Sequence, residues 1–241
     1  MNSNPIRVFI VDDSQYMRYV LKNILKEDPG IEVVGEARDG IDALEKIEAL
    51  KPDVVTLDVE MPRMDGLATL KKIMSLFPVP VLMVSRYTQD GGDVTIEALE
   101  SGAIDFVQKP DGRDSLTMNK VRDELVSKIK VAAAIKCAKI TPASKQAGKP
   151  AAPRERPWKT TQGIMRKVIV IGSSTGGPKA LAEVLTRIPA DIPAGILVVQ
   201  HMPPGFTVSL AKRLDQLSMI EVSEAKEDDI VAPGKAFIAP G

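Results

Sequence analysis

Acidic residues follow two apolar, strand-like segments of the sequence. Asp12 and Asp13 come directly after Ile6–Val11, and Asp58 follows Asp53–Leu57. If both segments are parallel strands of one sheet, the three carboxylates meet at its carboxyl edge, where α/β folds bind their ligands. Three carboxylates in one pocket repel one another, so the site needs a cation. Oxygen ligands suit Mg²⁺, and the sequence therefore predicts a magnesium site here.

Other residues complete this predicted pocket. Ser85 and Lys109 each end a further strand-like segment, which directs a hydroxyl group and an ammonium group toward the carboxylates. The backbone carbonyl of Glu60 is a further candidate metal ligand. A carboxylate flanked by Mg²⁺ and a lysine can attack a phosphoryl group, because both cations neutralise charge on its oxygens. Asp58 is the central carboxylate. Any of these residues alone is more often a cap, a turn former or a surface charge, but their combination favours phosphoryl chemistry.

A second candidate site lies in residues 168–178, which are typical of a strand, a Gly-rich turn and a helix. From the residues alone, two interpretations stay open: a phosphate bound at the helix N-terminus, or a nucleophilic serine in Gly172-x-Ser174-x-Gly176. The segment lacks the glycine patterns of nucleotide-binding loops. His201 is the only histidine in the chain and follows the strand-like segment Gly195–Gln200. Ser–His catalysis requires such a base beside the serine, although a lone histidine is more often structural.

The elements that must position these residues alternate along the first 135 residues. Helical apolar periodicity, as in Met17, Leu21 and Leu25, separates five β-branched segments. Ser14 is the predicted N-cap of the first helix. Alternating strands and helices predict a five-stranded, doubly wound parallel sheet. Its predicted strands are Ile6–Val11, Ile31–Gly35, Asp53–Leu57, Val79–Ser85 and Ala103–Val107.

The sequence divides into three predicted parts: a domain over residues 1–135, a flexible linker over 136–163, and the N-terminal part of a second, Rossmann-like α/β domain over 164–241. Residues 136–167 carry nine Lys or Arg and one acid. Ala, Pro, Gly and Ser interleave these charges, so we interpret the stretch as a solvated linker rather than a nucleic-acid-binding segment. The second part has a predicted buried strand at Val168–Ile171 and strands at Gly195–Gln200 and Ala236–Ala239, which bury little core alone. We therefore expect the second domain to be cut short at residue 241.

Composition excludes several classes of protein. No run of about 18 apolar residues is present, so we expect no membrane insertion. The N-terminus lacks the basic and apolar regions of a secretory signal. The single cysteine, Cys137, permits neither an intrachain disulfide nor a cysteine-based metal site. These features predict a cytoplasmic protein.

Residues 6 to about 130 resemble the receiver domains of two-component response regulators. The motifs that carry the resemblance are Val-Asp-Asp-Ser (11–14), Leu-Asp-Val-Glu-Met-Pro-Arg-Met-Asp-Gly (57–66), Val-Ser (84–85) and Lys-Pro (109–110). The resemblance implies that Asp58 is the phospho-acceptor and that a histidine kinase is its partner. It also implies a set of supporting roles: Mg²⁺ ligands at Asp12 and Asp13, phosphate sensors at Ser85 and Lys109, and a switch aromatic at Phe106. Ordinary core packing accounts for Phe106 equally well.

The C-terminal part is similar to the chemotaxis protein-glutamate methylesterases, in which a receiver domain also comes first. The motifs are Ile-Gly-Ser-Ser-Thr-Gly-Gly-Pro (171–178), Gln-His-Met-Pro-Pro-Gly-Phe-Thr (200–207) and Ala-Pro-Gly-Lys-Ala-Phe-Ile-Ala-Pro-Gly (232–241). The resemblance implies cofactor-free hydrolysis of glutamyl methyl esters on chemoreceptors, and deamidation of receptor glutamines. Ser174 is then the nucleophile and His201 its base, with the Thr175 amide in the oxyanion hole.

One departure from this family pattern limits the prediction for the chain itself. The family takes its triad aspartate from a Gly-rich segment downstream of residue 241, and the nearby Asp228 and Asp229 belong to a predicted exposed turn. We therefore expect the 241-residue chain to lack full activity. The family also suggests that the unphosphorylated receiver covers the serine site.

The alternative hypothesis is a non-catalytic receiver protein or phosphate sink whose second domain only binds partners. Release of methanol from a methylated receptor separates this hypothesis from the esterase. A DNA-binding regulator is rejected, because the C-terminal part offers strands and Gly-Pro turns rather than a helix-turn-helix.

Overall fold

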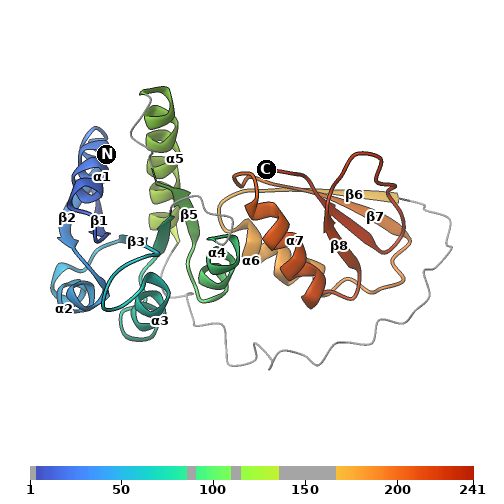
Figure 1. Cartoon of the computed structure of the whole chain (residues 1–241), viewed down its shortest axis with the longest axis horizontal. Helices are drawn as coiled ribbons and strands as arrows, with labels where there is room; N and C mark the ends of the chain where they lie inside the picture. The colour runs from blue at the N-terminus through green and yellow to red at the C-terminus, as the bar shows by residue number, and fades with distance from the viewer. Residues whose placement is uncertain (1–3, 86–90, 110–114, 136–166) are drawn as a thin grey trace. The chain divides into compact units, whose positions relative to one another are not determined.

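The computed structural model describes residues 4–85, 91–109, 115–135 and 167–241 (Figure 1). The chain divides into two compact units, residues 1–145 and 146–241, and each is described by itself. The predicted linker, 136–163, lies outside the described residues, so the bounds of the three predicted parts stay predictions. None of the described helices is both long and apolar enough to cross a bilayer.

The first unit is a five-stranded parallel sheet in the order β2-β1-β3-β4-β5. The helices α1 and α5 pack on one face of this sheet, and α2, α3 and α4 lie on the other (Figure 1). This architecture confirms the predicted doubly wound α/β fold. The strands are β1 Ile6–Val11, β2 Ile31–Ala37, β3 Val54–Asp58, β4 Val81–Ser85 and β5 Asp105–Gln108; the helices are α1 Gln15–Lys26, α2 Gly40–Leu50, α3 Gly66–Leu76, α4 Gly91–Glu100 and α5 Ser115–Ala134.

The core of the first unit explains why its sequence forms these elements. The central strands β1 and β3 are mostly apolar, and they are buried on both faces from Val8 to Val11 and from Val54 to Asp58, as expected for a sheet covered by helices on each side. The apolar stripe of α1, which includes Leu21 and Leu25, packs into one cluster with Leu125 and Ile129 of α5. Ser14 caps α1 by accepting a hydrogen bond from the Met17 amide, as predicted. This packing holds the carboxyl ends of the strands at one edge.

The second unit is a four-stranded parallel sheet in the order β6-β7-β9-β8. The three predicted strands are present, each within a few residues of its expected bounds, and the predicted helix follows the Gly-rich turn. The short strand β8 was not predicted, because in Glu-Val-Ser-Glu only Val222 is apolar and buried. The elements are β6 Lys167–Ser173, α6 Gly177–Leu185, β7 Ala194–Gln200, α7 Phe206–Leu217, β8 Glu221–Glu224 and β9 Lys235–Ile238.

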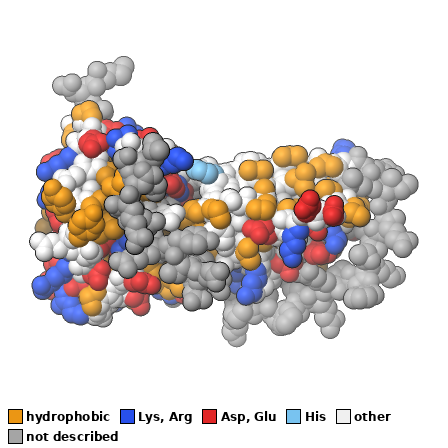
Figure 2. All heavy atoms as spheres, turned by 45° about the horizontal axis from the view of Figure 1, so that its top comes forward, with side chains coloured by type: hydrophobic (Ala, Val, Ile, Leu, Met, Phe, Trp, Pro, Cys, Tyr) orange, Lys and Arg blue, Asp and Glu red, His pale blue; other side chains and the backbone are white. Residues whose placement is uncertain are grey.

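The predicted strand at Val168–Ile171 is present, but the prediction that it is buried is wrong. β6 is an edge strand that pairs with β7 alone among the described strands. Val168, Ile169 and Val170 are exposed, Val170 by 69%, and Ile171 is half-buried. Exposed apolar side chains are visible along the second unit in Figure 2. The β-branched sequence correctly indicated a strand, but strand propensity does not report whether other elements cover it.

Candidate functional site

The topology of the first unit brings the three predicted carboxylates together. β1 and β3 are neighbours, with Val11 opposite Leu57, so Asp12 and Asp58 lie side by side at the carboxyl edge. One carboxylate oxygen from each of Asp12, Asp13 and Asp58 lies within 4.8 Å of the others. Asp12 and Asp58 are only 1% and 3% exposed, whereas Asp13 is exposed. We call these residues, together with Lys109, the acidic pocket.

Lys109 enters the acidic pocket from the end of β5. Its backbone amide donates to the Ser85 carbonyl at 2.8 Å, which fixes it beside the end of β4. The Nζ atom donates to Asp58 Oδ2 at 2.6 Å and lies 2.8 Å from Asp12 Oδ2. Ser85 is itself buried at this edge. The structure thus places the predicted lysine against two carboxylates, while the phosphate-sensing roles of Lys109 and Ser85 stay predictions.

The electrostatics of the acidic pocket suit a bound cation. Burial raises the pKa of Asp58 to about 6, and the repulsion of Asp12 adds to this effect, while the hydrogen bond and charge of Lys109 oppose it. Asp12 Oδ2 is buried and accepts no hydrogen bond of good geometry, although Lys109 is close. The single positive charge of Lys109 therefore does not balance the three carboxylates. Their oxygen atoms are ligands that fit Mg²⁺.

The loop after Asp58 is held by contacts that the sequence did not reveal. The Glu60 amide donates to Asp58 Oδ1 at 3.3 Å, and Gly66 donates to the Val59 carbonyl at 2.9 Å. A Cβ atom on Gly66 would lie 2.0 Å from the Asp58 carbonyl oxygen, so only glycine fits there. Arg63 forms an ion pair with the buried Asp39, the N-cap of α2. These contacts fix the loop that carries the predicted Glu60 carbonyl ligand.

Phe106 lies in β5 and is buried, with Lys128 of α5 against it. Lys128 Nζ donates to the Phe106 carbonyl at 2.7 Å and lies 5.2 Å from the centre of its ring. The same ammonium group lies 2.8 Å from Glu124 and 3.5 Å from Asp105. No pattern in the sequence indicates that Lys128 is buried, because its helical position alone does not distinguish it from an exposed lysine. The contacts fit core packing, and the switch role of Phe106 stays a prediction.

In the second unit, Ser174 and His201 are brought into contact by neighbouring strands. β6 and β7 pair in parallel with Ser173 opposite Gln200, so the next residue of each strand lies at the same edge. Ser174 Oγ lies 3.4 Å from His201 Nδ1, the long end of hydrogen-bonding distance. Both side chains are exposed, and the single histidine appears in pale blue at the surface in Figure 2. Their catalytic roles stay predictions.

The turn that presents Ser174, residues 172–177, has the geometry of a strand-to-helix elbow. Gly176 adopts φ 75°, a backbone conformation that favours glycine, and α6 begins at the next residue. The Gly177 amide donates to the Ser174 carbonyl at 2.7 Å. The Thr175 amide makes no hydrogen bond within the described part of the chain, so it is available to an incoming oxyanion. We call residues 172–177 the serine turn.

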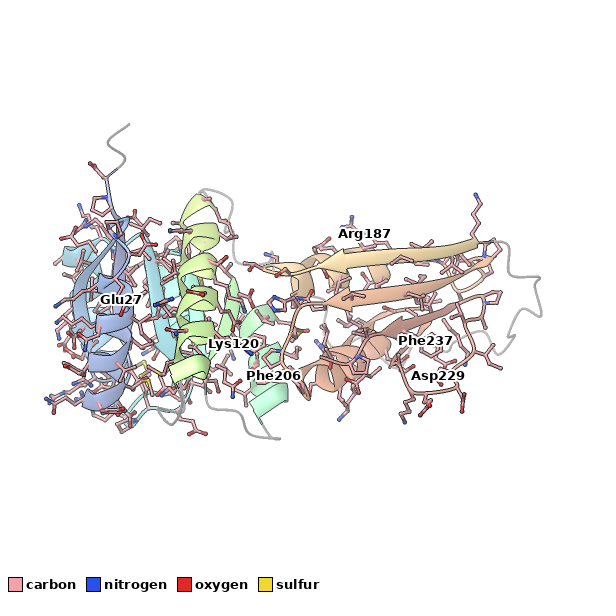
Figure 3. The ribbon with its side chains drawn as sticks, turned by 90° about the horizontal axis from the view of Figure 1, so that it is seen from above. Glu27, Lys120, Arg187, Phe206, Asp229 and Phe237 are labelled. Carbon is pink, nitrogen blue, oxygen red and sulfur yellow. The ribbon has the colours of Figure 1, made fainter. Side chains whose placement is uncertain are left out.

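No described acid takes the third position of a triad. Asp228 and Asp229 are exposed, and Asp229 accepts a hydrogen bond from the Lys226 amide. Figure 3 shows Asp229 at the opposite end of the second unit from Phe206, the first residue of α7. The structure therefore agrees with leaving both residues out of the site.

Comparison with known proteins identifies the family. Residues 8–120 match the response regulator receiver domain, and residues 169–241 match the CheB methylesterase family. A protein-glutamate methylesterase/protein-glutamine glutaminase of Symbiobacterium thermophilum is 53% identical over 98% of this chain and 67% of that protein. The chain belongs to this methylesterase/glutaminase family. Its member from Pyrococcus horikoshii is 50% identical over 98% of this chain and 63% of that protein, so the chain spans about two thirds of the length of these relatives.

A solved structure of the family matches the first unit. The response regulator domain of Thermotoga maritima CheB is 50% identical, with a TM-score of 0.51, and the match covers 55% of this chain and 99% of that domain. The acidic pocket lies inside the receiver match, and the serine turn and His201 lie inside the methylesterase match. The chain thus combines a receiver with methylesterase sequence, in the order that the motifs predicted.

Proposed function

We propose that this protein is a phosphorylation-regulated hydrolase that removes methyl groups from glutamyl esters on chemoreceptors and deamidates receptor glutamines. The observation that carries the proposal is the contact of Ser174 with His201, at the ends of adjacent strands and inside the methylesterase match. A histidine kinase is the proposed phosphoryl donor, and a cytoplasmic location follows from these partners. The non-catalytic alternative has no comparable observation in its favour.

In the proposed reaction, Ser174 Oγ attacks the ester carbonyl carbon while His201 takes the hydroxyl proton. The negative charge that develops on the carbonyl oxygen is stabilised by the Thr175 amide. The tetrahedral intermediate collapses, and His201 returns the proton to the departing methoxy group, which leaves as methanol. Water then attacks the acyl-serine with His201 again as base, which frees the glutamate carboxylate and restores the Ser174 hydroxyl.

In the receiver, Asp58 is the proposed acceptor of the phosphoryl group. Asp12, Asp13, Asp58 and the Glu60 carbonyl would hold Mg²⁺, which supplies neutralising charge to the phosphoryl oxygens when bound. Asp58 Oδ attacks the phosphorus atom of the donor, and the donor nitrogen or oxygen leaves with the bonding electrons. Lys109, already placed against Asp58, then pairs with a phosphoryl oxygen.

Substitution of the serine or the histidine tests the hydrolase. In the full-length protein, Ser174→Ala and His201→Gln should each lower kcat for methanol release from a methylated receptor by about 10⁴-fold. Ser173→Ala is the matched control and should stay within about threefold of wild type, because Ser173 does not contact the reacting atoms. Turnover within about tenfold of wild type for Ser174→Ala would show that the assignment is wrong.

The phospho-acceptor is tested separately. With acetyl phosphate and Mg²⁺, wild-type protein should gain acid-labile phosphate and Asp58→Asn should gain none, because an amide is not a nucleophile toward phosphorus. Phosphate incorporation is measured by intact-protein mass spectrometry. Incorporation by Asp58→Asn at the wild-type rate would assign the acceptor role to another residue.

A further inference from the structure

Gln200 is a buried polar residue between the two members of the proposed catalytic pair. It is the last residue of β7, immediately before His201, and lies opposite Ser173 in the strand register. Its relative exposure is 4%, whereas Ser174 and His201 are exposed. A buried amide requires hydrogen-bond partners, and those of Gln200 show what the residue does.

The side-chain amide of Gln200 makes hydrogen bonds to the serine turn and to His201, the first residue after β7. Nε2 donates to the Ser174 carbonyl at 3.0 Å and to the His201 carbonyl at 3.2 Å. Because carbonyl oxygens only accept, the nitrogen of the amide must face them. Oε1 then accepts from Ser173 Oγ at 2.7 Å. The side chain is thereby joined to the residue before the nucleophile, to the nucleophile and to the base.

The space around this amide is closely filled. A Cβ atom on Gly177 would lie 1.9 Å from Gln200 Oε1, so glycine at the start of α6 leaves room for the amide. The Ser174 carbonyl receives the Gln200 amide as well as the Gly177 amide at 2.7 Å. The backbone of the nucleophile is therefore fixed from α6 on one side and from β7 on the other.

We propose that Gln200 is a positioning residue that ties the serine turn to the His201 loop and holds Ser174 within reach of the imidazole. This inference rests on the proposed hydrolase function. Ser174 and His201 are exposed, so packing alone does little to orient them. The His201 amide donates to the Ser173 carbonyl at 2.9 Å, and Gln200 adds side-chain links across the same edge. Displacement of a reacting group by about 1 Å can cost about 10²-fold in rate.

Two substitutions remove the donor links in different ways. Gln200→Met keeps the length of the side chain but leaves the carbonyls of Ser174 and His201 without the amide donor. Gln200→Glu keeps the acceptor for Ser173 and places a carboxylate oxygen against the two carbonyls. Ser173→Ala is the matched control, because it removes only the bond to Oε1 and keeps both donor links.

We expect methanol release by full-length Gln200→Met and Gln200→Glu to show kcat lowered by about 10²-fold, with KM within about threefold of wild type. KM should change little, because the Gln200 side chain is buried and therefore not exposed to an incoming substrate. Ser173→Ala should stay within about threefold of wild type in both parameters. Ser174→Ala is run in parallel, and its retention of activity would overturn the proposed function rather than this inference.

A second readout does not depend on activity. His201 is the only histidine of these 241 residues, so in the 241-residue chain its imidazole NMR resonances need no assignment if the affinity tag contains no histidine. We expect the two Gln200 variants to shift or broaden these resonances and Ser173→Ala to leave them in place. Wild-type kcat and an unchanged imidazole spectrum in Gln200→Met, with Ser174→Ala inactive, would overturn the proposal. Failure of both Gln200 variants to fold, judged by circular dichroism, would also overturn it, since Gln200 would then serve the fold.

Discussion

At the scale of single residues, Asp58 must satisfy two opposed requirements. As a nucleophile it has to be ionised, yet its burial at the end of β3 favours the protonated form and raises its pKa to about 6. The Lys109 ammonium, 2.6 Å away, opposes that effect. The resulting balance leaves a carboxylate that is ionised at neutral pH but costly to keep buried. A site built in this way gains stability from any cation that enters it.

The free-energy cost of keeping the ionised Asp58 carboxylate buried should be measurable in metal-free protein. Because the pKa of Asp58 rises from 3.8 to about 6 on folding, the folded state binds the proton more tightly, and ionisation destabilises the fold as pH rises between these values. In EDTA above pH 6, we expect Asp58→Asn to be more stable than wild type, and the difference to vanish below about pH 4. Urea unfolding in a Trp158→Phe background, followed by tyrosine emission, measures this, since all three tyrosines of the 241 residues lie in residues 1–135 and Trp158 is their one tryptophan.

Addition of Mg²⁺ serves as the control for this measurement. It should stabilise wild type more than Asp58→Asn and so reduce the difference in the free energy of unfolding between the two proteins. The electrostatic account of Asp58 would be contradicted if Asp58→Asn were less stable than wild type at pH 7.5. It would also be contradicted if the difference in the free energy of unfolding were the same at pH 4 and pH 7.5.

At the scale of elements, α5 is attached to the sheet by a buried cation as well as by its apolar stripe. Lys128 is 4% exposed and joins the backbone of β5, through the Phe106 carbonyl, to the carboxylates of Asp105 and Glu124. Asp105 is buried as well. Loss of the ammonium group would therefore leave a buried carboxylate without its counter-ion, which is much more costly than loss of an exposed pair.

Lys128→Met is expected to lower the free energy of unfolding by about 3 kcal/mol. Lys120→Met, in the same helix but at an exposed position (labelled in Figure 3), is the matched control and should change it by less than about 0.5 kcal/mol. The double variant Lys128→Met/Asp105→Asn should recover part of the loss, because it removes the unpaired carboxylate. Equal stability of the two single variants in urea unfolding would rule out the buried ion cluster as a stabilising contact.

At the scale of the whole molecule, the receiver and the methylesterase part are two compact units in one chain. Phosphorylation can activate the esterase only by the difference in its free energy of interaction with the inhibited and active states, commonly about 1–3 kcal/mol. The family resemblance predicts that the inhibited state is one in which the receiver covers the serine site. A shortened protein that lacks the receiver tests this mechanism.

Removal of residues 1–140 from the full-length protein should raise methanol release from a methylated receptor by about 5- to 150-fold over the unphosphorylated protein. The comparison is made at matched concentration, with Asp58→Asn as a control that should match unphosphorylated wild type. Equal or slower turnover by the shortened protein would mean that the receiver does not inhibit by occlusion.

The sequence by itself determined the fold class and placed the strands of the first unit to within about two residues, and it indicated which side chains meet at the two candidate sites, whose roles stay predictions. The candidate residues directly follow strand-like segments in the sequence, and a parallel sheet brings the carboxyl ends of its strands to one edge. The sequence therefore indicates which side chains meet there. Tertiary structure alone decided the exposure of β6 and the partners of Gln200 and Lys128. Apolar composition and helical spacing look the same for a covered and an uncovered strand, or for a buried and an exposed lysine. The sequence records which side chains are present, whereas burial and hydrogen-bond partners depend on which distant segments pack beside them.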